Sequence, residues 1–253
     1  MNLTNGAYEI DIIVQGYPGK SVCHGGLGWS TLALIRGKDR LVVVDTGPCS
    51  YRGLIKEGLK KRGLAAGDVT HLVLTHCHYD HSVNWVMFRN AQIFIGAEEM
   101  AWARKLEWGT NAVPELYVAE LDKWPKVTFL KDRDEIFPGF TAYLAPGHTP
   151  GCLVFVLEGR EHDVIFTGDA AKNRAELVSR DTDMTYDKSI SKASIEMMWT
   201  HWRKKPGSIV IPGHDTPMVL KDGKPTYIGK LEAAVKQWTG DDLETTTLYQ
   251  LVM

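Results

Sequence analysis

The chain has 253 residues, of which 44% are hydrophobic and 24% are charged, the balance of an ordinary soluble globular protein with room for a continuous core. Its net charge of −2 provides no overall positive field that would draw it onto nucleic acid. No apolar run approaches the roughly 20 residues needed to cross a bilayer. We therefore expect one domain over residues 1–253, with neither nucleic-acid nor membrane partners.

Short β-type runs bounded by turn residues open the chain and recur along it. The predicted strands span residues 8–14, 31–35, 41–44, 72–75, 92–95, 127–130, 141–144, 153–157, 164–167 and 208–211. The predicted helices, from apolar side chains spaced at 3.6 residues, span 50–61, 97–107, 190–204 and 227–238. In the first helix Leu54, Ile55 and Leu59 share one apolar face. This order is typical of two sheets packed face to face with helices outside.

The four cysteines lie far apart and include no CxxC pair. The first residues have neither the basic start nor the apolar run of a signal peptide. We therefore expect reduced thiols and a cytoplasmic location.

The segment THCHYDH, residues 75–81, contains three of the nine histidines directly after an apolar strand. Residues two apart in an extended segment point the same way, so His76 and His78 can converge on one metal ion. A turn directly afterwards would aim Asp80 and His81 at a second ion. Imidazole and carboxylate groups are good ligands for zinc and similar divalent cations.

Three further fragments each carry a ligand-type side chain after a strand and a glycine, which lets the backbone turn sharply. They are APGHTPG at residues 145–151, FTGD at 166–169 and IPGHD at 211–215. Each fragment alone is a weak signal. Together they predict that His148, Asp169 and His214 lie along one edge of the sheets.

The ordered set VVVDTG, THCHYDH, APGHTPG, FTGDAA and IPGHD resembles the metallo-β-lactamase superfamily from about residue 30 to residue 217. The resemblance implies an α+β fold, an αββα sandwich of two mixed sheets, with metal ions at the rim between them. Carried over by position, the ligands of a first metal would be His76, His78 and His148. The ligands of a second metal would be Asp80, His81 and His214. Asp169 would bridge both metals, and Asp45 would support a ligand without binding metal; a turn or helix-cap role for Asp45 is the alternative.

This ligand set implies two Zn²⁺ per chain, with Mn²⁺ or Fe²⁺ as alternatives. Bound metal lowers the pKa of water to ~7, so the expected step is attack of a metal-bound hydroxide on a carbonyl carbon. The two metal ions would carry more positive charge than the two carboxylates, Asp80 and Asp169, can neutralise. This excess positive charge favours the developing oxyanion. Asp80 would also orient the water or shuttle its proton. The expected reaction is hydrolysis of an ester, lactone or amide bond in a small molecule.

Departures from particular branches narrow the expected substrate. Asp169 stands where the best-known zinc β-lactamases have Cys, which disfavours antibiotic hydrolysis. Lactonases that act on acyl-homoserine lactones place a Tyr three residues after the bridging Asp, where this chain has Lys172. Tyr186 would be a substitute for that Tyr. Lys172 and Tyr186 are therefore candidate substrate-binding residues.

Two regions near the expected site carry further candidates. His24 and Trp29 flank a glycine-rich loop, and both are candidate substrate-binding residues. The segment 101–124 holds Trp102, Trp108, Tyr117 and Trp124. These rings would form a lid that favours an aromatic substrate, or they would pack a helix pair against the core.

Other functions stay open from the sequence. They are a mononuclear-iron persulfide dioxygenase, a thioesterase, a phosphodiesterase or nuclease, and a scaffold protein with degenerate metal sites. A homodimer through the aromatic segment or the C-terminal tail also stays open.

Overall fold

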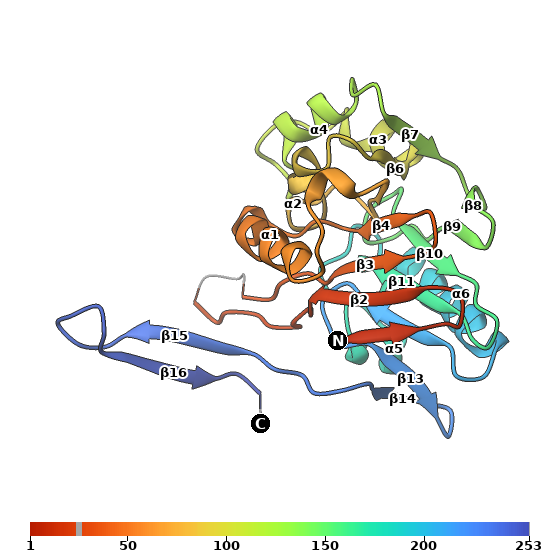
Figure 1. The fold of residues 1–253 in the computed structure, drawn as a ribbon. Coiled ribbons are helices and arrows are strands. Elements are labelled where there is room, and N and C mark those ends of the chain that lie inside the picture. The colour runs from red at the N-terminus through yellow and green to blue at the C-terminus, as the bar shows by residue number, and fades with distance from the viewer. Residues whose placement is uncertain (24–26, 253) are drawn as a thin grey trace.

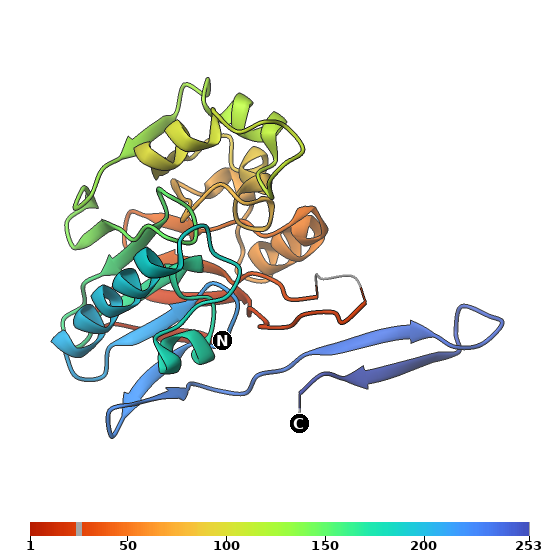
Figure 2. The ribbon, with the colours of Figure 1, turned by 180° about the vertical axis from the view of Figure 1, so that it is seen from behind.

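The computed structural model describes residues 1–23 and 27–252. Across these residues the chain forms two seven-stranded sheets that face each other, together with a separate two-stranded hairpin (Figure 1). Helices cover the outer faces of both sheets (Figure 2). This arrangement confirms the predicted αββα sandwich.

The first sheet is antiparallel over its first four strands and parallel from the fourth to the seventh. In spatial order the strands are β1 (Asn2–Thr4), β2 (Glu9–Val14), β3 (Leu32–Arg36), β4 (Leu41–Val44), β5 (His71–Val73), β6 (Gln92–Gly96) and β7 (Val127–Leu130). Since β4 and β5 are parallel, the loops after them leave the sheet at the same edge.

The second sheet contains one parallel pair, β11 with β12, and its other pairs are antiparallel. In spatial order the strands are β14 (Lys224–Tyr227), β13 (Met218–Lys221), β12 (Ile209–Pro212), β11 (Val164–Gly168), β10 (Leu153–Leu157), β9 (Phe140–Leu144) and β8 (Glu135–Phe137). The parallel pair again brings two strand ends to one edge.

Short helices connect the strands. The α-helices are α1 (Arg52–Lys60), α2 (Tyr79–Ser82), α3 (Ala97–Ala103), α4 (Glu115–Leu121), α5 (Arg174–Ser179) and α6 (Lys188–Lys204). The 3₁₀ turns are η1 (Cys49–Tyr51), η2 (Ala66–Asp68), η3 (Val83–Met87) and η4 (Asp169–Ala171). Apolar residues of α1, α3 and α4 pack on the first sheet, and those of α5 and α6 pack on the second.

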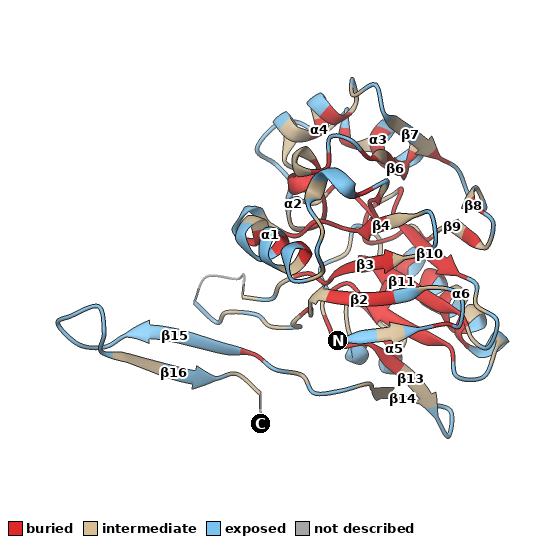
Figure 3. Cartoon of the chain, viewed as in Figure 1, coloured by how far each residue is buried: buried red, intermediate tan, exposed pale blue. Residues whose placement is uncertain are grey.

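The buried residues form three apolar layers, one between the sheets and one under each group of helices (Figure 3). Strand β4 shows how one strand serves two layers. Val42 and Val44 pack between the sheets, whereas Val43 packs under the helices. Because side chains alternate between the faces of a strand, burial on both faces requires a continuous apolar run. Such a run is what residues 41–44 contain.

The C-terminal region corrects one prediction. The helix expected over 227–238 is wrong, because β14 ends at Tyr227 and β15 (Ala234–Trp238) pairs with β16 (Thr246–Gln250). Gly229 has a φ of +85°, whereas a helix requires a negative φ, so no helix runs through this residue. Pairing with the distant segment 246–250 then decides the conformation, and local apolar spacing cannot reveal such pairing.

Smaller differences concern element bounds. Helix α3 ends at Ala103, four residues before the predicted end. In α1, Ile55 and Leu59 are buried as expected, but Leu54 is 49% exposed, so it does not share the buried face. Among the described helices, none has the length and apolar character needed to span a membrane.

Candidate metal centre

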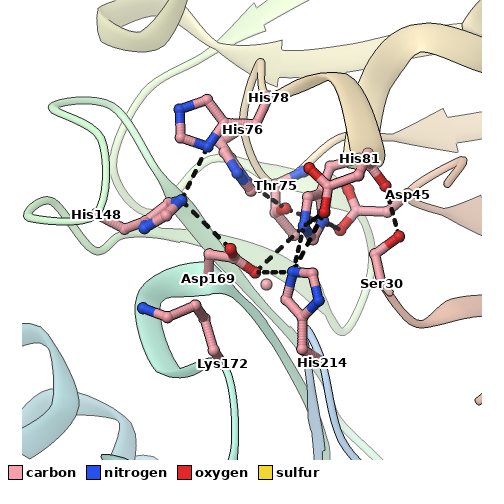
Figure 4. A network of polar contacts seen from close by, with 12 residues as sticks. Ser30, Asp45, Thr75, His76, His78, His81, His148, Asp169, Lys172 and His214 are labelled. Atoms are coloured by element: carbon pink, nitrogen blue, oxygen red, sulfur yellow. Dashed lines mark hydrogen bonds and ion pairs between the residues drawn. The ribbon is translucent and has the colours of Figure 1, made fainter. Parts of the chain in front are cut away.

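The predicted ligand residues lie on loops that follow strands at the same edge of the sandwich. His76 and His78 follow β5, and His81 lies in α2 directly beyond them. Asp169 follows β11 directly. Each loop begins where a strand ends, so the rigid sheets determine where the side chains meet (Figure 4).

The first part of the cluster joins two loops from different sheets. His148 Nε2 lies 3.0 Å from His78 Nδ1 and 3.3 Å from Asp169 Oδ2. The ligand atoms of His76, His78 and His148 all lie within 4.8 Å of one another. These are the residues that the resemblance assigned to a first metal.

The second part lies on the other side of Asp169. Its Oδ1 is 3.2 Å from His81 Nε2 and 3.2 Å from His214 Nε2, and those two nitrogens are 3.2 Å apart. Asp80 Oδ2 lies 3.4 Å from His214 Nε2 and 3.6 Å from His81 Nε2. Asp80, His81 and His214 form a second group within 4.8 Å, and Asp169 reaches both groups. The fold thus brings all seven predicted residues together.

The donor atoms in this cluster fit divalent cations. Nitrogen atoms of His78 and His148 face each other, as do those of His81 and His214, although a pair of neutral ring nitrogens can share only one proton. The buried His76 Nε2 has no hydrogen-bond partner, and Asp169 Oδ1 lies 3.2 Å from two histidine nitrogens without a well-aligned hydrogen bond to either. Buried polar atoms are usually well bonded, so a free ring nitrogen and a carboxylate oxygen aimed at one point suit an ion with mixed nitrogen and oxygen ligands.

The electrostatics divide the histidines into two classes. Burial lowers the pKa of His76 well below its usual value and lowers that of His148 to about 3, so both rings are neutral and can offer a lone pair. Burial acts the same way on His81 and His214, but nearby carboxylates, chiefly Asp169, overcome it and raise both pKa values. Cation binding there would displace protons from these two rings.

Two contacts, the first of them fully buried, orient the ligand side chains. Asp45 Oδ2 accepts from His81 Nδ1 at 2.8 Å, and its two oxygens also accept from the Thr75 amide and hydroxyl. His148 Nδ1 faces the Met184 carbonyl at 3.1 Å. Such contacts at the second ring nitrogen direct the first one toward a metal.

A cavity of about 570 Å³ opens above the cluster. Its floor includes ligand residues of both groups, namely His78, Asp80, His148, Asp169 and His214. Its walls combine largely apolar side chains, namely Tyr17, Pro18, Leu27, Tyr79, Ala112, Ala175 and Met184, with polar ones that include Lys20, Lys172, Asn173, Asp181 and Asp183. A small molecule with both an apolar and a polar part fits this lining.

The proposed substrate-binding residues have different positions. Lys172 lines the cavity, but its ammonium is held by Glu176 Oε1 at 2.7 Å and the Asp183 carbonyl at 2.6 Å. Tyr186 is 69% exposed and is not part of the cavity wall. Trp29 is also outside the wall, with its indole N–H donated to the Gln15 carbonyl. His24 lies outside the described residues.

The aromatic segment 101–124 is mainly packing. Trp124 lies against Trp85 with ring centroids 5.3 Å apart, and the Tyr117 carbonyl accepts from the Trp85 indole. Trp108 is exposed. Trp102 comes nearest the site, with its ring 6.4 Å from that of His78.

The sequence pointed to the loop 180–187 only through Tyr186 and not through Met184. Met184 in this loop lines the cavity and contacts His148 through its carbonyl. Lys20, which also lines the cavity, forms an ion pair with Asp183 at 2.6 Å. Backbone carbonyls carry no residue-type signal, so no motif in this loop could have revealed the contact.

Comparisons with known proteins agree with this geometry. A family model described as the metallo-beta-lactamase superfamily matches residues 27–214. Metallo-beta-lactamase domain-containing protein 1 from Xenopus laevis is 27% identical over 227 residues, which cover 86% of this chain and 84% of that protein. An N-acyl homoserine lactonase from a Bacillus species is 25% identical over 159 residues, covering 62% of this chain and 60% of the lactonase.

A solved structure extends the similarity to the fold. AidC, described as a dizinc quorum-quenching lactonase in complex with a product, aligns with a TM-score of 0.72 at 19% identity, covering 91% of this chain and 97% of AidC. At this identity the likeness concerns the fold. The family match spans every segment that carries the seven clustered residues, and the chain belongs to the metallo-β-lactamase superfamily.

Proposed function

We propose that this protein is a hydrolase that uses two divalent cations, most simply Zn²⁺, to cleave an ester, lactone or amide bond in a small molecule. One observation carries the proposal: seven nitrogen- and oxygen-bearing side chains converge on the floor of a cavity that is large enough for such a molecule. The relatives named as lactonases support the choice of an acyl bond.

In this proposal the seven residues have distinct roles. His76, His78 and His148 would hold one cation, and Asp80, His81 and His214 would hold the other. Asp169 would contribute to both, consistent with its oxygens facing opposite groups. Asp45 supports His81. The bound cations would supply Lewis acidity that polarises a carbonyl oxygen and lowers the pKa of water to about 7.

Side chains of the protein would accept the proton of the attacking water and bind the substrate. Asp80 is partly open to the cavity, with its side chain 18% exposed, so it would orient the attacking water and take up its proton. Burial by itself would raise the pKa of Asp169. The surrounding histidines outweigh this effect and hold the pKa well below its usual range, so Asp169 stays an anion. The apolar side chains of the walls would hold the acyl part of the substrate.

Two further observations bear on the size of the substrate and on the location of the enzyme in the cell. The apolar side chains of the walls and the modest cavity favour a small organic molecule over a macromolecule. All four cysteines are free thiols, which supports the proposed cytoplasmic location.

The test is a panel of lactones, thioesters, aryl amides and phosphodiesters assayed with protein loaded with Zn²⁺, Mn²⁺ or Fe²⁺. We expect acyl hydrolysis by protein that holds two cations per chain, with activity lost on chelation and regained on reloading. Asp169→Asn should lower kcat/KM at least 100-fold, on the order of a lost electrostatic contribution in an active site. The exposed Asp39→Asn serves as control and should leave activity unchanged.

Three outcomes would overturn the proposal. Full activity of Asp169→Asn would contradict the bridging role. One iron per chain together with oxygen consumption would indicate a dioxygenase. Cleavage of phosphodiesters alone would indicate a nuclease or phosphodiesterase.

A further inference from the structure

Glu99 is a buried carboxylate outside the cluster that the proposed mechanism does not use. It lies in the first turn of α3 and has no solvent exposure. Its Oε1 accepts from the Cys77 amide at 2.8 Å, and its Oε2 accepts from the Gly151 amide at 3.1 Å. One side chain therefore joins two loops that are more than 70 residues apart in the sequence.

These two loops carry the first group of ligand histidines. Cys77 lies between His76 and His78, and its amide N–H belongs to the peptide bond that joins it to His76. Gly151 follows His148 by three residues. Both amides bond to the same carboxylate. Glu99 therefore restrains the distance between the loop that carries His76 and His78 and the loop that carries His148.

The backbone around Glu99 is packed too tightly for alternative arrangements. A Cβ atom on Gly151 would lie 1.9 Å from the Glu99 amide nitrogen, and one on Gly96 would lie 2.7 Å from the Gly151 carbonyl oxygen. In addition, the Leu153 amide donates to the Thr75 carbonyl at 2.9 Å. The glycines thus allow α3 to approach the second loop closely enough for the carboxylate to span both.

Burying a carboxylate at this position costs free energy of folding. Burial raises the pKa of Glu99 to about 7, although the Thr149 side chain and the two amide N–H groups favour the charged form. An apolar side chain of similar size would avoid that cost but would leave both amides unpaired. The feature that a carboxylate adds is two acceptors at a fixed spacing.

We propose that Glu99 is a positioning residue that holds His76, His78 and His148 at the separation required for one cation, an inference that rests on the proposed function. Asp45 supports the other group through His81, and it also accepts from the Thr75 hydroxyl, which lies 3.1 Å from His76 Nδ1. Glu99 bonds only to the two loops of the first group, so loss of Glu99 affects that half selectively.

The experiment measures Zn²⁺ affinity by chelator competition in protein that keeps only one half of the centre. His214→Ala leaves the group of His76, His78 and His148, and His148→Ala leaves the other group. Adding Glu99→Gln, which keeps the shape but has one acceptor fewer, should weaken Zn²⁺ binding about 10–100-fold in the first background. In the second background the change should be less than about 3-fold, since Glu99 has no contact with that group.

The neighbouring Glu98→Gln is the matched control, because Glu98 is exposed on the same turn of α3 and should change affinity in neither background. If Glu99→Gln does not fold, Glu99→Asp replaces it, since the shorter side chain keeps the charge but cannot reach both amides. The Co²⁺ absorption spectrum adds a readout of ligand geometry, and it should change in the first background alone.

The outcomes separate this inference from the proposed function. Equal weakening of both halves, or no weakening of either, overturns the positioning role of Glu99. If unmodified protein binds no divalent cation, the proposed function itself is wrong. If that protein binds two cations and Glu99→Gln binds them equally tightly, the proposed function stands and the role of Glu99 does not.

Discussion

At the scale of single residues, the centre depends on side chains that never face the cavity. Asp45 follows β4 with a φ of +55°, a left-handed conformation that Asp and Asn adopt more readily than most residues. This turn brings both carboxylate oxygens onto Thr75 and His81. The direction of the His81 ring therefore depends on an unusual backbone conformation directly after β4.

Asp45→Asn tests this dependence. Asn tolerates the same backbone angle but replaces one acceptor oxygen with an NH₂ group, so the protein should fold while His81 loses its fixed orientation. We expect the affinity of the Asp80, His81 and His214 group for Zn²⁺ to fall about 10–100-fold, measured by chelator competition in the His148→Ala background. An unchanged affinity, with an unchanged thermal transition, would contradict the supporting role.

At the scale of elements, the loop 180–187 is held against the cavity by α5 and the turn before it. Lys172 bonds to the Asp183 carbonyl and to Glu176. Glu176 in turn accepts from the Thr182 hydroxyl at 3.1 Å and the Asp183 amide at 3.2 Å. Because the loop then presents the Met184 carbonyl to His148, Lys172 acts on the site through the loop.

Lys172→Met distinguishes this role from direct substrate binding. Methionine keeps the length but leaves Glu176 without its cation, so the free energy of unfolding should fall by about 2 kcal/mol, as for a hydrogen bond to a charged group. Amide hydrogen exchange should accelerate at residues 182–186, with the exposed Lys204→Met as control. A raised KM with unchanged exchange in the loop would instead indicate that Lys172 binds the substrate.

At the scale of the whole molecule, the hairpin of β15 and β16 extends away from the sandwich (Figure 1). Every residue of β15 is exposed. The hairpin touches the body near its base, where the Tyr17 hydroxyl donates to the Leu251 carbonyl at 3.4 Å. A two-stranded hairpin is marginally stable in water by itself, so this one is expected to gain stability from a further surface.

We predict that the surface belongs to a second copy of this chain. Large apolar side chains are exposed along the hairpin, namely Val235, Trp238, Leu243, Leu248 and Tyr249. The strand register places Trp238 and Leu248 on one face of the hairpin and Val235 and Tyr249 on the other, so a partner on the first face would contact Trp238 and Leu248. A two-fold arrangement would use both hairpins equally.

Light scattering coupled to gel filtration tests this prediction. The protein should elute at about twice the chain mass of 28.3 kDa. Trp238→Ser combined with Leu248→Ser should shift it to the monomer, because these two side chains share one face of the hairpin. The polar pair Gln237→Ser and Thr247→Ser is the control and should remain dimeric. A monomeric wild-type protein at micromolar concentration would refute the prediction.

The sequence by itself determined the fold class and the residues that form the cluster. Apolar runs such as 41–44 and 153–157 predicted strands correctly because burial on both faces leaves a continuous apolar signal. The seven ligand-type residues were recognisable because each follows a strand in a short motif. Both features are written into residue type and local spacing.

Only the tertiary structure decided how those residues are supported and where the tail goes. Glu99 resembles any helix-start glutamate in the sequence, and its role depends on two amides brought to it by loops from different sheets. The contact of Met184 with His148 is made by a carbonyl that every residue possesses. The helix expected over 227–238 failed for the same reason, because pairing with residues 246–250 outweighs local preference. Contacts between distant segments have no signature in local sequence, so they appear only once the chain is folded.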